Sequence, residues 1–165
     1  MRGTVKWSLD PTWEAVDRTR EAVEVFFRET GFTDDAVFAR TMVVSELVEN
    51  SVKYGDFTDP AARIELAVSV TEGEVTVEVS HPTPPAELPH LERLDRMIQY
   101  IRGFQDPFEA YVEQLKQVAR RSLDDSESGL GLARMAYEGK ALLDFFVEAD
   151  GVLNLSAVVA APEER

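Results

Sequence analysis

Two segments of alternating apolar and polar residues, 61–80 and 141–160, place the strongest limit on what this chain can fold into. Alternation with a period of two is typical of strands that bury one face. A turn signal divides each segment, Glu72-Gly73 in the first and Asp150-Gly151 in the second. The pattern therefore predicts two β-hairpins. Their strands are expected at residues 61–71, 74–80, 141–148 and 152–160.

The rest of the chain has mainly helical periodicity, after a short alternating strand at residues 4–9. Asp10-Pro11 predicts a helix start with Asp10 as the cap, and Gly31 and Gly55 are expected to end the first two helices. The helices are expected at residues 11–30, 33–54, 88–102, 106–121 and 129–137.

This order of elements predicts an α+β fold rather than a parallel doubly wound sheet, in which strands and helices would alternate. We expect a two-layer sandwich, with a mixed, mostly antiparallel sheet and the helices on one face. The length of 165 residues fits one domain, 1–165, in which the helical pair at about 88–121 is an insertion.

Composition excludes several classes of function. The net charge of −14 makes nucleic acid and anionic membranes poor partners, because a polyanionic surface repels phosphate groups. The chain has no cysteine, which excludes disulfides, thiolate metal sites and a cysteine nucleophile. Its two histidines are too few for a histidine-rich metal site. No segment reaches the roughly 20 apolar residues needed to span a bilayer, so a cytoplasmic location is expected.

One helix carries a stripe of polar residues that could do chemistry. Glu46, Asn50 and Lys53 are spaced i, i+4 and i+7, which places them along one side of the helix. A carboxylate, an amide oxygen and an ammonium so arranged could activate a hydroxyl, bind a hard cation and neutralise phosphate. An ordinary solvated helix face would show the same spacing, so this pattern alone leaves both readings open.

A second motif precedes the short helix at 129–137. In Ser128-Gly129-Leu130-Gly131 the glycines would let backbone N–H groups converge at the amino end of a helix, which can bind an anion. Glycines also serve plain loop-to-helix turns, so this motif is weak when taken alone.

Together, and in this order, the two motifs resemble those of the histidine-kinase-like (GHKL) ATPase superfamily. The segment from Glu46 to Gly55 resembles its N-box, Glu/His-x-x-x-Asn, often followed by lysine and an aromatic residue. Residues 128–132 resemble its later glycine box, which precedes a helix and two strands, as here. The resemblance spans nearly the whole chain. In size and in the first N-box residue, the chain is most similar to the anti-sigma-factor serine kinases of bacterial partner-switching systems.

The resemblance implies roles for the matching residues. Glu46 would be the general base that activates water or a substrate serine. Asn50 would be the ligand of Mg²⁺ bridging the phosphates of ATP, and Lys53 would contact a phosphate. The glycine-box residues would hold phosphate oxygens through their backbone amides: Ser128, Gly129 and Gly131.

The sequence also departs from the superfamily. The middle box, Asp-x-Gly-x-Gly, binds adenine and should follow the strand that ends at Val79, but the chain reads Ser80-His81-Pro82-Thr83-Pro84-Pro85 there. A lone histidine at a strand end is expected to be structural or solvent-exposed. Acidic residues, among them Glu127, stand beside the glycine box and would repel a triphosphate. The segment 88–121 replaces a short lid and is expected either to pack on the core or to form a partner or dimer surface.

Three functions follow from these observations. The first is a signalling regulator of the partner-switching type, with weak or lost ATP binding, that binds a sigma factor or an anti-anti-sigma (STAS-like) protein. The second is an active Mg-ATP-dependent serine protein kinase or ATPase, and the third is a structural homodimer. The departure at the middle box favours the first and leaves enzymatic activity open.

Overall fold

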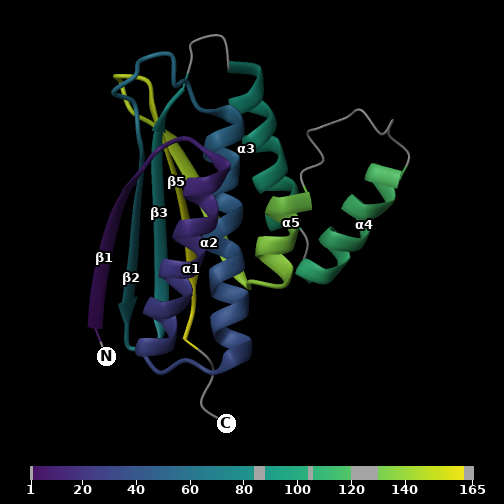
Figure 1. Ribbon diagram of the computed structural model, residues 1–165. Coiled ribbons are helices and arrows are strands. Elements are labelled where there is room, and N and C mark those ends of the chain that lie inside the picture. The colour runs from purple at the N-terminus through teal and green to yellow at the C-terminus, as the bar shows by residue number, and fades with distance from the viewer. Residues whose placement is uncertain (1, 84–87, 104–105, 120–129, 162–165) are drawn as a thin grey trace.

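The computed structural model describes residues 2–83, 88–103, 106–119 and 130–161, and its elements follow the predicted order (Figure 1). The strands are β1 (Arg2–Leu9), β2 (Ile64–Thr71), β3 (Glu74–Pro82), β4 (Ala141–Val147) and β5 (Val152–Val159). The helices are α1 (Trp13–Glu29), α2 (Asp34–Tyr54), α3 (Leu88–Arg102), α4 (Pro107–Ala119) and α5 (Leu130–Tyr137).

The strands form a five-stranded sheet in the order β1-β2-β3-β5-β4. All four pairings are antiparallel, so the described sheet is antiparallel throughout. The helices lie over one of its faces, with α1 and α2 crossing the sheet and α3, α5 and α4 following toward one side (Figure 1). The predicted α+β sandwich is confirmed, including both hairpins.

The first hairpin shows how local sequence sets the register of the sheet. Glu72 and Gly73 both have positive φ, 52° and 85°, as a two-residue type I′ turn requires. This turn pairs Glu74 with Thr71. This register places Val75, Val77 and every second residue beyond them on the buried face of the sheet. A slip of one residue would expose that whole row.

The first helix begins later than the sequence predicts, and its cap is not Asp10. Thr12 is the N-cap, and its hydroxyl accepts the N–H of Ala15 at 3.2 Å. Asp10 instead forms an ion pair with Arg63 at 3.2 Å, and its carbonyl accepts the N–H of Thr12. Both residue types make good caps, and the position of Arg63 decides between them.

Strand limits also differ from the prediction: β1 begins at Arg2 rather than at residue 4, and β4 and β5 each end one residue early. β2 begins at Ile64 rather than at residue 61, because residues 59–62 form a turn in which the Ala62 N–H donates to the Asp59 carbonyl. β3 continues past Ser80 to Pro82, which pairs with Val152 of β5. β5 thus continues to pair with β3 as far as Pro82, although proline has no N–H to donate to the sheet.

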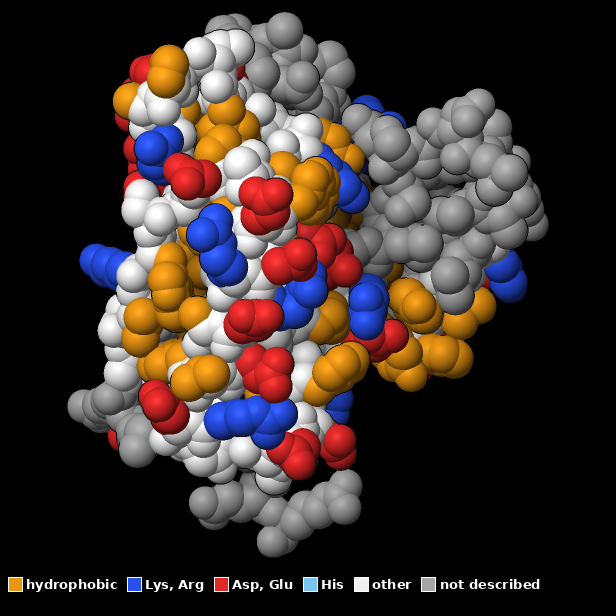
Figure 2. All heavy atoms as spheres, in the orientation of Figure 1, with side chains coloured by type: hydrophobic (Ala, Val, Ile, Leu, Met, Phe, Trp, Pro, Cys, Tyr) orange, Lys and Arg blue, Asp and Glu red, His pale blue; other side chains and the backbone are white. Residues whose placement is uncertain are grey.

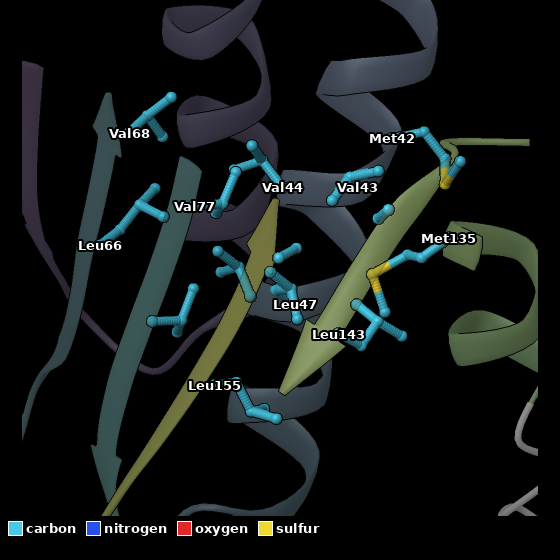
Figure 3. Close-up of a cluster of buried hydrophobic side chains, with 14 of the residues drawn as sticks. Met42, Val43, Val44, Leu47, Leu66, Val68, Val77, Met135, Leu143 and Leu155 are labelled. Carbon is cyan, nitrogen blue, oxygen red and sulfur yellow. The ribbon is translucent and has the colours of Figure 1, made fainter. Parts of the chain in front are cut away.

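Helix α2 is the central element of the core. Val43, Val44, Leu47 and Val48 are almost fully buried against the sheet. Figure 3 shows side chains from α2 meeting those of the strands, with Met135 of α5 beside Leu143 of β4. This packing fixes the rotation of α2 and so decides which of its residues face away from the sheet. Within the described residues, no helix is long and apolar enough to cross a membrane.

The inserted helices differ in how deeply they pack. Leu94, Ile98 and Ile101 of α3 are buried, and α3 contacts α5 and β4. Helix α4 packs mainly on α5 and lies at the outer edge of the helical layer (Figure 1). The expectation that segment 88–121 packs on the core therefore holds for α3. Helix α4 packs on α5 with one side and leaves residues such as Phe108 exposed on another.

Candidate functional site

The polar stripe of α2 lies on the side of the helix that faces away from the sheet. The side chain of Glu46 is 20% exposed, Asn50 is half-buried and Lys53 is exposed. The alternative of an ordinary solvated helix face does not describe Glu46, which is mostly shielded from water. Within the described residues, the side chain of Asn50 makes no hydrogen bond, so its amide is available to a ligand.

Burial changes the acid–base behaviour of Glu46. Desolvation is the largest cause that raises the pKa of this carboxyl, and the charge of Glu49 acts in the same direction. Arg134 and Lys53 oppose the shift without cancelling it. A carboxylate with a raised pKa is a stronger proton acceptor, which suits a general base.

Arg134 of α5 is a member of the site that the sequence analysis missed. Its guanidinium lies 3.7 Å from Glu46 Oε1, and its Nε donates to Glu138 Oε2 at 2.7 Å. The hydrogen bond to Glu138 is the main cause that raises the pKa of Arg134, and the charges of Glu138 and Glu46 act with it. Arg134 therefore connects α5 with α2. The i, i+4 spacing of Arg134 and Glu138 was the only local signal for it.

A hollow of about 300 Å³ reaches Glu46 from the side of α1. Its lining includes Arg20, Ser45, Glu49 and Arg134. Arg20 donates to the Ser45 hydroxyl at 3.2 Å and lies 3.4 Å from Glu49. Each of these arginines is already held by a carboxylate, so an anion entering the hollow would compete with ion pairs of the chain itself.

Helix α5 brings Gly131 of the glycine box toward the N-box. Gly139, just after α5, packs against Val43, and Arg134 lies near Glu46, so α5 runs antiparallel to α2. Its amino end, which contains Gly131, therefore points toward the level of Asn50. Ser128 and Gly129 lie outside the described residues. Of the three residues expected to bind phosphate through the glycine box, only Gly131 falls within the described residues.

The end of β3 is closed in by neighbouring backbone. His81 is 2% exposed, and its Nδ1 lies 2.9 Å from the Pro82 carbonyl oxygen. The same carbonyl accepts the N–H of Asp56 at 2.8 Å, and the Thr83 N–H donates to Gly151 at 2.9 Å. His81 is thus a structural residue, in line with one of the two expectations, and it is not solvent-exposed.

The comparisons with known proteins agree with this fold. The family described as the histidine kinase-like ATPase domain matches residues 9–137, which is most of the chain. This chain belongs to the histidine kinase-like ATPase domain family. Among solved structures it is similar to a chain in the crystal structure of the SiaB–SiaC complex from Pseudomonas aeruginosa, with a TM-score of 0.71 and 18% identity. That match covers 94% of this chain and 88% of the other. No curated protein matches the chain.

In a histidine kinase-like ATPase domain, the N-box and the end of β3 would hold opposite ends of Mg-ATP. Asn50 and Lys53 offer an amide oxygen and an ammonium, which suit Mg²⁺ and phosphate. At the adenine end, His81 is buried in the core and Pro82 has no N–H to offer a base. The described residues of that strand end include neither a carboxylate nor a glycine. The described residues of this strand end therefore do not fit the adenine base.

Proposed function

We propose that this histidine kinase-like domain is a bacterial signalling regulator of the partner-switching type, which binds a partner protein and has weak or no affinity for ATP. The observation that carries the proposal is the end of β3. The family uses an aspartate and glycines there to bind adenine, whereas this chain has a buried His81 and a backbone held by Asp56 and Gly151.

The comparison with a solved complex supports a protein partner. The structure that aligns with 94% of this chain is that of a two-protein complex, SiaB with SiaC. A domain that keeps its fold while its adenine site is closed can still present its surface to another protein. By the sequence resemblance, a sigma factor and a STAS-like protein are the partner classes to test.

Isothermal titration with ATP and ADP, with and without Mg²⁺, tests the nucleotide part of this proposal. We expect no saturable binding, or a Kd weaker than about 1 mM, equivalent to about −4 kcal/mol. Micromolar, Mg²⁺-dependent binding that is lost in Asn50→Ala would contradict it. Gln99→Ala is the control, because Gln99 is an exposed amide residue on α3 and belongs neither to the N-box nor to the end of β3.

Binding to candidate partners tests the other part. Sigma factors and STAS-like proteins from the same genome would be titrated against the wild type and against Glu46→Gln and Asn50→Ala. The proposal expects one of them to bind, with the same affinity for all three forms. A large loss of affinity in a folded Asn50→Ala variant would show that partner binding depends on the nucleotide site.

One observation favours the second candidate, an active serine protein kinase. Glu46 is shielded from water and its pKa is raised, as suits a residue that takes the proton of a substrate hydroxyl. A phosphotransfer assay on the bound partner, with Glu46→Gln as the control, tests this candidate. Phosphorylation by the wild type that Glu46→Gln abolishes would establish the kinase.

A further inference from the structure

An aromatic cluster on α4 and α5 is exposed although the core lies close by. It consists of Phe108 and Tyr111 of α4 and Tyr137 of α5. The Tyr137 ring lies 5.1 Å from that of Phe108 and is stacked 5.5 Å from that of Tyr111. Phe108 is 48% exposed and Tyr137 is 36% exposed, and apolar side chains gather over this end of the molecule in Figure 2. The cluster thus presents aromatic surface to solvent beside the candidate site.

Carboxylates border the cluster. Asp106 precedes α4 and accepts the N–H of Phe108 at 3.0 Å, and Glu109 stands in the first turn of the helix. Both are exposed, and neither forms an ion pair with a described residue. Glu113 and Glu138 are also nearby in the sequence, but they are paired with Lys116 and Arg134. The border of the cluster is therefore negative where α4 begins.

The charge of the chain argues against a second copy as the occupant of this surface. Two copies would each bring a net charge of −14. A symmetric interface uses the same patch of both copies, so it would bring the carboxylates of Asp106 and Glu109 from both copies into one interface. Anionic lipid and nucleic acid are disfavoured by the same repulsion. A cationic and partly apolar occupant avoids this repulsion.

We propose that the surface of Phe108, Tyr111 and Tyr137, bordered by Asp106 and Glu109, docks an amphipathic segment of a partner protein that carries Lys or Arg beside apolar residues. The apolar side chains would cover the aromatic rings. The cations would meet the carboxylates and the faces of the rings. The inference deepens the proposed function and rests on it only in requiring a protein partner.

A pair of synthetic peptides tests the chemistry of the docking surface. One is an amphipathic helix of leucine and lysine, and the other has glutamate in place of lysine. Isothermal titration of the full chain should show saturable binding of the lysine peptide and none of the glutamate peptide. Equal binding of both peptides would overturn the proposal, as would no binding of either.

Variants locate the binding on the surface. Phe108→Ser and Glu109→Lys should each weaken binding of the lysine peptide by at least about tenfold. Phe146→Ser and Glu14→Lys are the matched controls: Phe146 is a 60% exposed phenylalanine on β4, and Glu14 is an exposed acid in the first turn of α1. Circular dichroism would verify that each variant is folded. Equal weakening in the controls would mean general attraction to an acidic protein and would overturn the assignment.

Two further measurements separate the outcomes. Light scattering of the wild type and of Phe108→Ser tests the second copy, and a dimer that the substitution dissociates would overturn the proposal. The peptide titrations use no nucleotide, so their failure is distinct from that of the proposed function, which would appear as micromolar ATP binding. If the lysine peptide binds as expected and ATP also binds tightly, the docking surface is supported. The nucleotide part of the proposed function is then rejected.

Discussion

Gly139 offers a sharp test of how α5 is seated on the N-box helix. A Cβ atom at this position would lie 2.7 Å from the Met135 carbonyl oxygen and closer still to Val43 Cγ2. Val43 is fully buried, and a valine on a helix has one strongly preferred rotamer, so neither neighbour can move aside alone. Gly139→Ala must therefore push the end of α5 away from α2.

The expected cost follows from overpacking. Forcing a methyl group into a filled interior typically costs about 1 to 3 kcal/mol. A chain of this size loses roughly 2 to 4 °C in Tm for each kcal/mol, so Gly139→Ala should lower Tm by about 2 to 12 °C. Thermal unfolding followed by circular dichroism measures this. The matched control is Gly3→Ala, whose Cβ would lie at an ordinary 3.9 Å from Phe26.

The same substitution should be detectable at Glu46. Arg134 lowers the pKa of this carboxyl against the effect of burial, so moving α5 away should raise the pKa further. Titration of the Glu46 carboxyl by NMR would follow the change. If Gly139→Ala unfolds at the same temperature as Gly3→Ala and leaves the titration of Glu46 unchanged, the described contact between α5 and α2 is wrong.

Three other predictions concern the core and its charges. Because burial raises the pKa of Glu46 above the ordinary value, this carboxyl favours folding at low pH and loses that contribution as pH rises through its folded pKa. The Tm advantage of Glu46→Gln over the wild type should therefore grow from about pH 4.3 toward neutrality, and a constant or shrinking difference would contradict the assignment. Leu47→Ala should cost about 3 to 5 kcal/mol in denaturant unfolding, because Leu47 is fully buried, and a loss below about 1 kcal/mol would place it outside the core. Arg40 is 6% exposed, its Nε has no partner among the described residues, and its guanidinium lies 4.5 Å from the Phe32 ring centroid. Arg40→Met should keep that contact without the buried charge and leave Tm unchanged or higher, whereas a marked fall would reveal a stabilising role for the cation.

Local patterns were enough to predict the order of the elements and the stripe on α2. The alternation around Val77 and the Glu72-Gly73 turn depend on backbone geometry that neighbouring residues determine. The stripe of Glu46 and Asn50 depends only on the period of a helix. These features were therefore readable from the chain without knowledge of its tertiary contacts.

The remaining features depend on contacts between distant segments. Arg63 draws Asp10 away from the helix start, and pairing with Val152 extends β3 to Pro82. The burial of His81 follows from its place on the inner row of that strand. Arg134 reaches Glu46 only because α5 packs against α2. Local signals exist for two of these cases, the strand alternation that reaches His81 and the i, i+4 spacing of Arg134 and Glu138. The ion pair of Asp10, the pairing of Pro82 and the contact of Arg134 with Glu46 require partners that the sequence places far away.

The position of Arg134 has a consequence for how such chains can vary in evolution. One guanidinium serves Glu46 on α2 and Glu138 on α5. Replacing it with an apolar residue would leave the shielded Glu46 carboxylate without this counter-charge. Homologous chains that lose the arginine should therefore also change the residue at position 46. An alignment in which positions 46 and 134 vary independently would mean that α2 and α5 do not share this ion.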